Sequence, residues 1–270
     1  MAAMMLRSVA VACVLLGSWL GPASASVTDG VVVEGGRVRL VTAGGPNEDG
    51  TVDGALEIAL EHGWKTYWRD PGDAGVPPQI DIGKSTNVAD VAIEFPTPER
   101  FADGTTSWAG YKHSVAFPLR FKLADPEEET AIEAHVFVGI CQSICIPVQA
   151  TFSLDPESDP DNVDDADIVA TARAALPAKQ RPGFGAKLVG RDDHALTVEA
   201  TVPGAADKAE LFVAGTQGLM LGTPERRGAK GHVATFSVPI LDEPKQPALG
   251  PLPYTLATRA GAVEGALALP

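Results

Sequence analysis

The chain has 270 residues, and 35 acidic against 21 basic side chains give it a formal net charge of −14 at neutral pH. Such a negative field repels phosphate backbones, so the composition argues against nucleic acid as a partner. The 28 glycines and 22 prolines favour many short strands separated by turns. The length is sufficient for one large domain or two ordinary ones.

The first 25 residues have the pattern of an export signal. One basic residue, Arg7, precedes an apolar run from Val9 to Leu20, and the small residues Ala23-Ser24-Ala25 follow. The apolar run is shorter than the roughly 20 residues of a transmembrane helix, and no later segment approaches that length. We therefore expect residues 1–25 to be a signal peptide cleaved near Ala25. The mature chain is expected in the periplasm, without spanning a membrane.

Residues 27–155 have the strand and turn pattern of an antiparallel β-sandwich. Apolar residues alternate in three runs, which is the period of a half-buried strand. The runs are Leu56, Ile58 and Leu60; Val91, Ile93 and Phe95; and Val115, Phe117, Leu119, Phe121 and Leu123. Turn residues such as Asp125-Pro126 separate the runs. The sequence therefore predicts an all-β first domain.

Cys141 and Cys145 are the only cysteines that remain once the signal peptide is removed. A fully extended strand would separate their Cα atoms by roughly 13 Å. A disulfide needs about 4.4–6.8 Å, so the chain must turn between them. Closing so short a ring stabilises the fold by only about 2 kcal/mol in the chain-entropy model. The pair is therefore better placed as a reversible dithiol than as a staple, with a structural bridge and a metal site as alternatives.

The strands on either side of the cysteines predict which face of the sheet the pair occupies. Apolar residues fall on even positions, namely Ile132, Ala134, Val136 and Val138 before the pair, and Val148, Ala150, Phe152 and Leu154 after it. Both cysteines are odd, so alternation puts them on the face away from the core. A dithiol that must meet a partner should be reachable, and this position favours that.

The rest of the chain divides into a linker and a second domain. Residues 156–182 form an acidic, proline-containing linker that ends in a short helix over 163–176, where acids crowd the first turn and Pro177 follows the end. This helix is expected to cover an edge of one domain, with partner binding as the alternative. Residues 183–270 are again rich in strands and predict a second, smaller β-sandwich without a catalytic cluster.

Two motifs in the first domain carry a family resemblance: Gly63-Trp-Lys-Thr-Tyr-Trp-Arg-Asp-Pro-Gly-Asp-Ala-Gly-Val-Pro-Pro78, followed by Cys141-Gln-Ser-Ile-Cys-Ile-Pro147. With both in this order, the chain resembles the periplasmic N-terminal domain of DsbD-type thiol:disulfide interchange proteins. It is most similar to the branch called suppressor of copper sensitivity B, here as a stand-alone soluble form.

The resemblance implies an immunoglobulin-like fold and a thiol:disulfide oxidoreductase of the protein-disulfide reductase type, without a cofactor. In this family the cysteine pair takes electrons from a membrane-embedded thiol transporter and hands them to thioredoxin-fold periplasmic proteins. The match assigns this role to Cys141 and Cys145. We expect the electrons to come from a separate DsbD-like membrane protein, and Cys145 to be the cysteine that contacts partners.

Further residues of the two motifs are candidates for the site. Trp64, Tyr67 and Trp68 are expected to cap the disulfide or form a docking wall, with packing in the core as the alternative. Pro147 is expected to fix the backbone after the pair. Asp70 and Asp73 are candidates for proton transfer to a leaving thiolate, with a solvated turn as the alternative.

A second hypothesis makes the chain a copper-binding or copper-tolerance accessory protein. Cys141, Cys145 and His135, which share the odd face of the strands, would then hold Cu(I), since soft sulfur ligands suit that ion. The alternative for His135 is exposed polar surface. A third hypothesis is a non-catalytic binding module in which the disulfide only tightens a loop.

Overall fold

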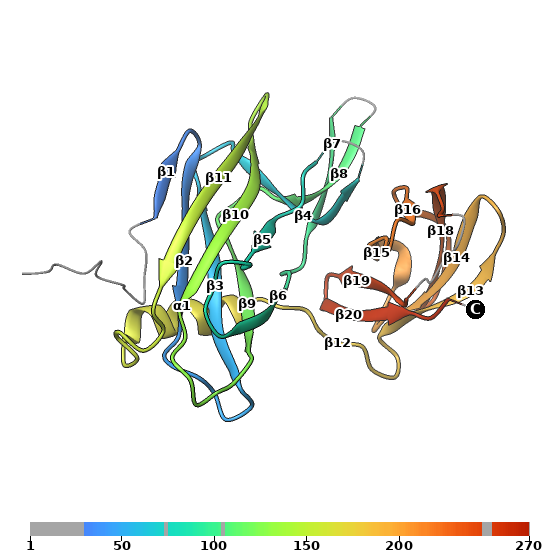
Figure 1. The fold of residues 1–270 in the computed structure, drawn as a ribbon. Coiled ribbons are helices and arrows are strands. Elements are labelled where there is room, and N and C mark those ends of the chain that lie inside the picture. Colours follow the sequence, from blue (N-terminus) through green and yellow to red (C-terminus); the bar gives the residue numbers. More distant parts are fainter. Residues whose placement is uncertain (1–29, 73–74, 104–105, 245–249, 270) are drawn as a thin grey trace, which may run out of the picture.

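The computed structural model describes residues 30–72, 75–103, 106–244 and 250–269. The predicted signal peptide and Asp73 lie outside these ranges. The described chain is almost entirely β, with one α-helix, and forms two sandwiches that lie side by side (Figure 1). No helix among the described residues is long and apolar enough to cross a bilayer.

The N-terminal sandwich, residues 31–154, consists of two antiparallel sheets. One sheet has the order β1 (Val31–Val33), β2 (Gly36–Thr42), β3 (Thr51–Leu60), β9 (Val115–Leu123) and β6 (Val88–Ile93). The other has the order β11 (Cys145–Leu154), β10 (Ile132–Cys141), β4 (Lys65–Gly72), β8 (Thr106–Tyr111) and β7 (Glu99–Asp103), and β5 (Gln79–Asp81) also pairs with β10. The immunoglobulin-like fold class predicted from the sequence is therefore confirmed.

The core of this sandwich follows the predicted alternation. In β10 and β11 the even positions are buried from Ile132 to Val138 and from Val148 to Leu154, whereas most odd positions are partly or fully exposed. In β9, Phe117, Leu119 and Phe121 are fully buried. The alternation of apolar and polar residues was sufficient to predict which side of each strand faces the core, because one face of each sheet is buried and the other is not.

The predicted helix is α1 (Val163–Ala174), and it packs on the outer face of the first sheet. The Asn162 side chain accepts a hydrogen bond from the backbone N–H of Asp165 and so caps the N-terminus. Val169 and Ala172 are buried against residues of β2 and β3, and Arg173 forms an ion pair with Glu94 at 3.1 Å. The helix thus covers this sandwich, as expected from its apolar face.

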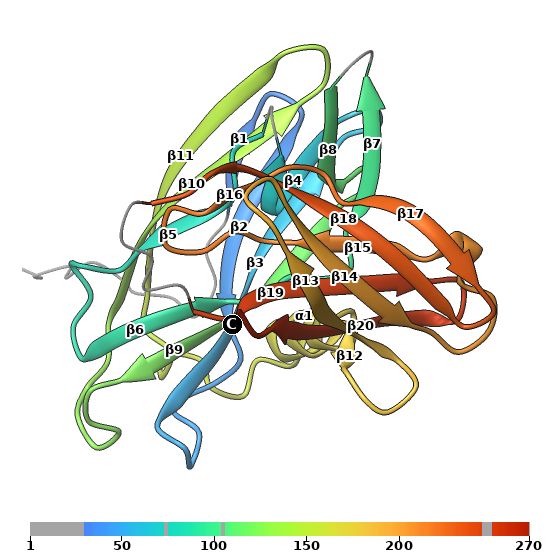
Figure 2. The ribbon, with the colours of Figure 1, turned by 90° about the vertical axis from the view of Figure 1, so that its right-hand side faces the viewer.

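The C-terminal sandwich, residues 178–267, has its own core of apolar residues. One sheet has the order β12 (Ala178–Lys179), β20 (Gly261–Leu267), β19 (Leu252–Thr258) and β15 (Glu210–Val213). The other has the order β13 (Gly185–Arg191), β14 (Ala195–Thr201), β18 (Val233–Asp242) and β16 (Met220–Leu221), with β17 (Glu225–Lys230) also on β18 (Figure 2). A short 3₁₀ helix, Ala206–Lys208, precedes β15.

The two sandwiches are in direct contact through β4, β7 and the β15 region. The rings of Trp68 and Phe212 meet edge to face at 5.8 Å between centroids. The Arg100 guanidinium donates a hydrogen bond of 2.9 Å to the carbonyl oxygen of Leu211 and lies 4.6 Å from the centre of the Phe212 ring. The backbone N–H of Gly215 donates to a carboxylate oxygen of Asp70 at 2.8 Å.

Candidate functional site

The two cysteines face each other across the tip of the β10–β11 hairpin. The strands are paired without interruption from Ile132↔Leu154 to Cys141↔Cys145, and residues 142–144 form the turn. The backbone N–H of Gln142 donates to the carbonyl oxygen of Ile144. This register places the two Cα atoms 4.1 Å apart, and the sulfur atoms form a disulfide. The turn that the spacing required is therefore a hairpin.

Cys141 and Cys145 differ sharply in their exposure to solvent. Cys141 is 1% exposed, whereas Cys145 is exposed. The neighbouring Ile144 at the tip is 74% exposed. A thiolate that approaches the hairpin tip can therefore reach Cys145, while Cys141 is shielded.

An outer aromatic cluster, separate from the main core, covers Cys141. It consists of Tyr67 from β4, Phe101 from β7 and Trp108 from β8. The Phe101 and Trp108 rings lie 4.1 Å apart between centroids, and Trp108 meets Tyr67 edge to face at 5.6 Å. Since the even residues of β10 point into the main core, the odd-numbered Cys141 is left on this second face.

Tyr67 is the side chain that touches both sulfur atoms. Its hydroxyl lies 2.9 Å from Cys141 Sγ and 2.8 Å from Cys145 Sγ. Disulfide sulfur carries no hydrogen, so the hydroxyl is the donor. Burial raises the pKa of Tyr67 above its ordinary value of 10.0, because loss of hydration penalises the phenolate. The hydroxyl therefore stays protonated at neutral pH and remains a donor.

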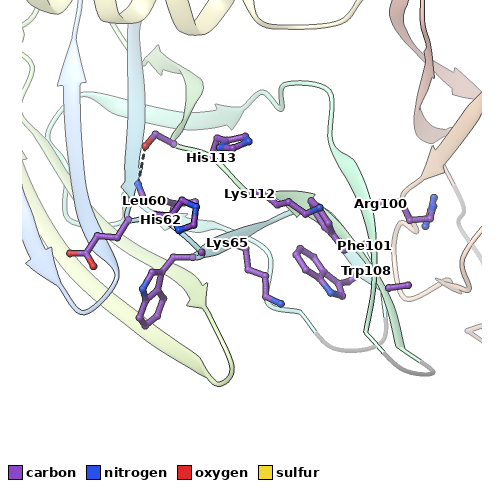
Figure 3. A pocket seen from close by; sticks show the side chains of 13 residues that line it. Leu60, His62, Lys65, Arg100, Phe101, Trp108, Lys112 and His113 are labelled. Carbon is purple, nitrogen blue, oxygen red and sulfur yellow. Dashed lines mark hydrogen bonds between the residues drawn. The ribbon is translucent and has the colours of Figure 1, made fainter.

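Two lysines extend along the same aromatic cluster. Lys65 of β4 is the backbone partner of Cys141 in the sheet, and its ammonium lies 4.6 Å from the centre of a Trp108 ring. The ammonium of Lys112 lies 4.1 Å from the centre of the Phe101 ring. Both lysines line a groove of about 920 Å³ beside the cluster (Figure 3). The aromatic cluster that covers Cys141 thus has two ammonium groups on its rings, both from segments distant in sequence from the cysteines.

Of the three aromatic residues expected at the disulfide, only Tyr67 lies there. Trp68 is 1% exposed and belongs to the main core, and Trp64, which is 8% exposed, belongs to the same core while also lining the groove. Even parity directs Trp64 and Trp68 to the face opposite Tyr67. Neither tryptophan therefore caps the disulfide: Trp68 packs in the core, and a docking wall stays a prediction for Trp64, which lines the groove. Pro147 is exposed and lies opposite Gly139 in the β10–β11 ladder.

Asp70 lies in the contact between the sandwiches and not beside the sulfur atoms. Its carboxylate accepts hydrogen bonds from the backbone N–H groups of Gly215 and Gly72. Burial raises the pKa of Asp70 despite these two bonds, because desolvation of the carboxylate outweighs them. The predicted role of Asp70 in proton transfer therefore does not fit its position.

His135 lies too far along β10 to share a ligand with the cysteines. Six residues of strand separate it from Cys141, or about 20 Å at roughly 3.3 Å per residue. Its Nδ1 lies 2.9 Å from the Thr151 hydroxyl, and its Nε2 lies 3.4 Å from the Glu133 carboxylate. The described residues contain no group of three or more His, Cys, Asp or Glu side chains that could hold a metal ion. The predicted Cu(I) ligand set with His135 is therefore wrong.

Phe101, Trp108, Lys65 and Lys112 were not identified from the sequence. The dipeptide Asp103-Gly104 between two strand-like runs is a hairpin signal, and β7 and β8 do pair as antiparallel neighbours, with Phe101 opposite Trp108. Nothing local indicates that this hairpin lies over Cys141, because the contact joins segments about forty residues apart in the sequence.

The fold and the site together define a class of protein: an immunoglobulin-like domain with an aromatic-covered disulfide at a hairpin tip. Residues 38–157 match the family described as "Thiol:disulfide interchange protein DsbD, N-terminal". The resemblance drawn from the two motifs is thereby confirmed for this segment.

A solved structure extends the comparison to both sandwiches. The crystal structure of the N-terminal periplasmic domain of ScsB from Proteus mirabilis is 23% identical, with a TM-score of 0.72, and the match covers 92% of this chain and 100% of that one. The two chains therefore share a fold. A match to the tandem immunoglobulin domains A164-A165 of titin, 12% identical over 86% of this chain and 96% of that one, has a TM-score of only 0.18. No curated protein matches the chain.

Proposed function

We propose that this protein exchanges electrons with other proteins through the Cys141–Cys145 disulfide, as a thiol:disulfide oxidoreductase of the protein-disulfide reductase type. The observation that carries the proposal is the asymmetry of the site. Cys145 is exposed at a hairpin tip, Cys141 is buried under aromatic rings, and Tyr67 bonds to both sulfur atoms. A bridge that only tightened a loop would need neither an exposed cysteine nor the hydroxyl.

The geometry suits attack at Cys145. An incoming thiolate attacks Cys145 Sγ, a mixed disulfide forms, and the Cys141–Cys145 bond breaks with Cys141 leaving as a thiolate. The Tyr67 hydroxyl lies within hydrogen-bond distance of the leaving sulfur and can stabilise its negative charge. Cys141 then either takes a proton from solvent or attacks the mixed disulfide to reverse the step. In the opposite direction of electron flow, the reduced Cys145 is the attacking group on a partner disulfide.

We place this exchange in the periplasm, between a DsbD-like membrane thiol transporter and thioredoxin-fold proteins. Three observations support the assignment: the signal-like N-terminal sequence, the family match over residues 38–157, and the shared fold with a periplasmic domain. The exposure of Cys145 supports its role as the cysteine that meets partners. The separate copper hypothesis loses the third ligand named for it, because His135 lies far along β10 from the cysteines.

The redox test is equilibration of the purified protein in thiol buffers, followed by counting of free thiols. We expect a single couple with a potential above about −300 mV, since structural disulfides of secreted proteins lie below that value. A disulfide that survives millimolar dithiothreitol while the protein stays folded would refute the proposal and favour a structural bridge.

The order of attack is tested by trapping. Cys141→Ser leaves Cys145 free and removes the residue that resolves the intermediate, so a mixed disulfide with a thioredoxin-fold protein should accumulate. Cys145→Ser is the matched control, because its remaining thiol is buried. If only Cys145→Ser trapped partners, the roles of the two cysteines would be reversed. If neither trapped them, exchange with proteins would be ruled out.

A further inference from the structure

The groove beside the disulfide is a positively charged feature on an acidic protein. Its walls are the turn and strand start at residues 60–65, the aromatic pair Phe101 and Trp108, and the segment 112–114 (Figure 3). Lys65, Lys112, His62 and His113 line it, and Glu61 is the one carboxylate among the described lining residues. The whole chain, by contrast, has 35 acidic and 21 basic residues.

The two lysines of this groove lack carboxylate partners of their own. Among the described residues, neither Lys65 nor Lys112 forms a salt bridge, whereas Lys84, Lys179 and Lys187 each do. Their ammonium groups instead lie over rings of the outer cluster. The Lys65 ammonium is 4.6 Å from the centre of a Trp108 ring, and the Lys112 ammonium is 4.1 Å from the centre of the Phe101 ring. A Lys ammonium that lies over an aromatic ring can still pair with an external anion, because the ring offsets only part of its positive charge.

The groove and the disulfide share a wall. Phe101 and Trp108 line the groove and also pack against Cys141 in the outer aromatic cluster. Lys65 is the backbone partner of Cys141. The groove is therefore bounded by residues that cover Cys141, the disulfide partner of the exposed Cys145.

We propose that this groove binds an acidic segment of the partner protein next to the partner's reactive cysteine. This inference rests on the proposed function and names the chemistry of its partner. Carboxylates on the segment would pair with Lys65 and Lys112, and its apolar parts would contact Trp108 and Phe101. A groove of about 920 Å³ has room for several side chains. The surrounding negative charge repels acidic proteins elsewhere on the surface, so complementarity at this place would select both the partner and its orientation.

The test uses the full chain in its disulfide form and three synthetic peptides. Each peptide has one cysteine, flanked by Glu, Gln or Lys residues at otherwise identical positions. The measurement is the second-order rate at which the peptide thiolate opens the Cys141–Cys145 bond to form a mixed disulfide at Cys145, expressed per thiolate so that differences in peptide thiol pKa cancel. At about 20 mM salt we expect the Glu peptide to react about tenfold faster than the Lys peptide, and at about 500 mM salt the difference should largely disappear.

The double variant Lys65→Gln/Lys112→Gln should abolish the preference for the Glu peptide. The matched control Lys208→Gln/Lys230→Gln removes the same charge from exposed positions on the C-terminal sandwich and should retain the preference. A preference for the Lys peptide, or a Glu preference equal in both variants, would overturn the inference and point to net charge alone. Failure of all three peptides to form a mixed disulfide with the protein would instead refute the proposed function itself.

Discussion

The two sandwiches have similar cores but differ in what covers the outer faces of their sheets. The C-terminal sandwich buries one apolar cluster between its sheets. The N-terminal sandwich has such a core and, in addition, the outer cluster of Tyr67, Phe101 and Trp108 over Cys141. The N-terminal sandwich therefore differs from the C-terminal one in an outer sheet face, where aromatic side chains of β4, β7 and β8 cover part of a disulfide.

Strands β4 and β7 contribute to both the outer cluster and the contact with the C-terminal sandwich. On each strand, one residue contacts the cluster and its neighbour contacts the C-terminal sandwich. On β4, Tyr67 touches the disulfide, whereas Trp68 meets Phe212 of the C-terminal sandwich. On β7, Phe101 packs over Cys141, whereas Arg100 bonds to the carbonyl oxygen of Leu211. Because successive side chains of a strand point to opposite faces, the C-terminal sandwich holds the same strands that cover the disulfide.

The largest effect is expected for Trp68→Ala, which removes a fully buried indole between the two cores. We expect the free energy of unfolding to fall by about 3–5 kcal/mol, because the remaining cavity adds to the lost burial. Urea unfolding of the oxidised protein measures this loss of unfolding free energy. Trp108→Ala is the matched control and should cost less, since Trp108 packs only with Tyr67, Phe101 and Cys141 in the outer cluster. Equal losses would contradict the division into a main core and an outer cluster.

Trp108→Ala should instead change the reactivity of the disulfide. Removal of the indole uncovers Cys141, so we expect dithiothreitol to reduce the oxidised protein about tenfold faster, which corresponds to about 1.4 kcal/mol in the barrier. Stopped-flow measurement without denaturant gives the rate. Phe236→Leu in the C-terminal core should leave the rate unchanged. An unchanged rate in Trp108→Ala would mean that the aromatic cluster does not shield the bond.

A smaller effect is expected for Tyr67→Phe, which removes only the hydroxyl. A thiolate accepts a stronger hydrogen bond than a disulfide sulfur does, so attack at Cys145 should slow by about 0.5–1.5 kcal/mol, or roughly 2- to 10-fold. Since the pKa of Tyr67 is raised, the effect should persist between about pH 7 and 9. Tyr111→Phe, whose hydroxyl bonds to the carbonyl oxygen of Pro96, is the control and should leave the rate unaltered.

The smallest effect concerns the contact between the sandwiches and depends on pH. Because burial raises the pKa of Asp70 in the folded state, that state binds the proton more tightly than the unfolded chain does. The contribution of Asp70 to stability is therefore greatest below its unfolded pKa, near 3.8, and falls as pH rises through the raised value. Asp70→Asn keeps an acceptor for Gly215 without the charge.

The Asp70→Asn variant has no carboxyl group at this contact and therefore lacks this pH dependence. The unfolding free energy of the wild type minus that of Asp70→Asn should decrease between about pH 4 and 7. Chemical unfolding at each pH provides the measurement. A difference that increased with pH would show that the ionised carboxylate is favoured in the contact.

Local patterning predicted most of the fold. Alternation of Phe117, Leu119 and Phe121 oriented β9, and acids in the first turn with Pro177 beyond the end predicted the helix. These signals work because strand and helix periods are properties of short segments. The same rule assigned the cysteines to the face away from the main core, where Cys141 meets the outer cluster.

The residue pattern alone predicted two β-sandwiches and a chain turn between Cys141 and Cys145. Which side chains cover that turn depends on the tertiary structure. Phe101, Trp108 and Lys65 converge on Cys141 from three strands, and the parity that places Tyr67 over the sulfur atoms places Trp64 and Trp68 in the core. Such convergence depends on which strands become neighbours in the sheet, and no short segment encodes that order.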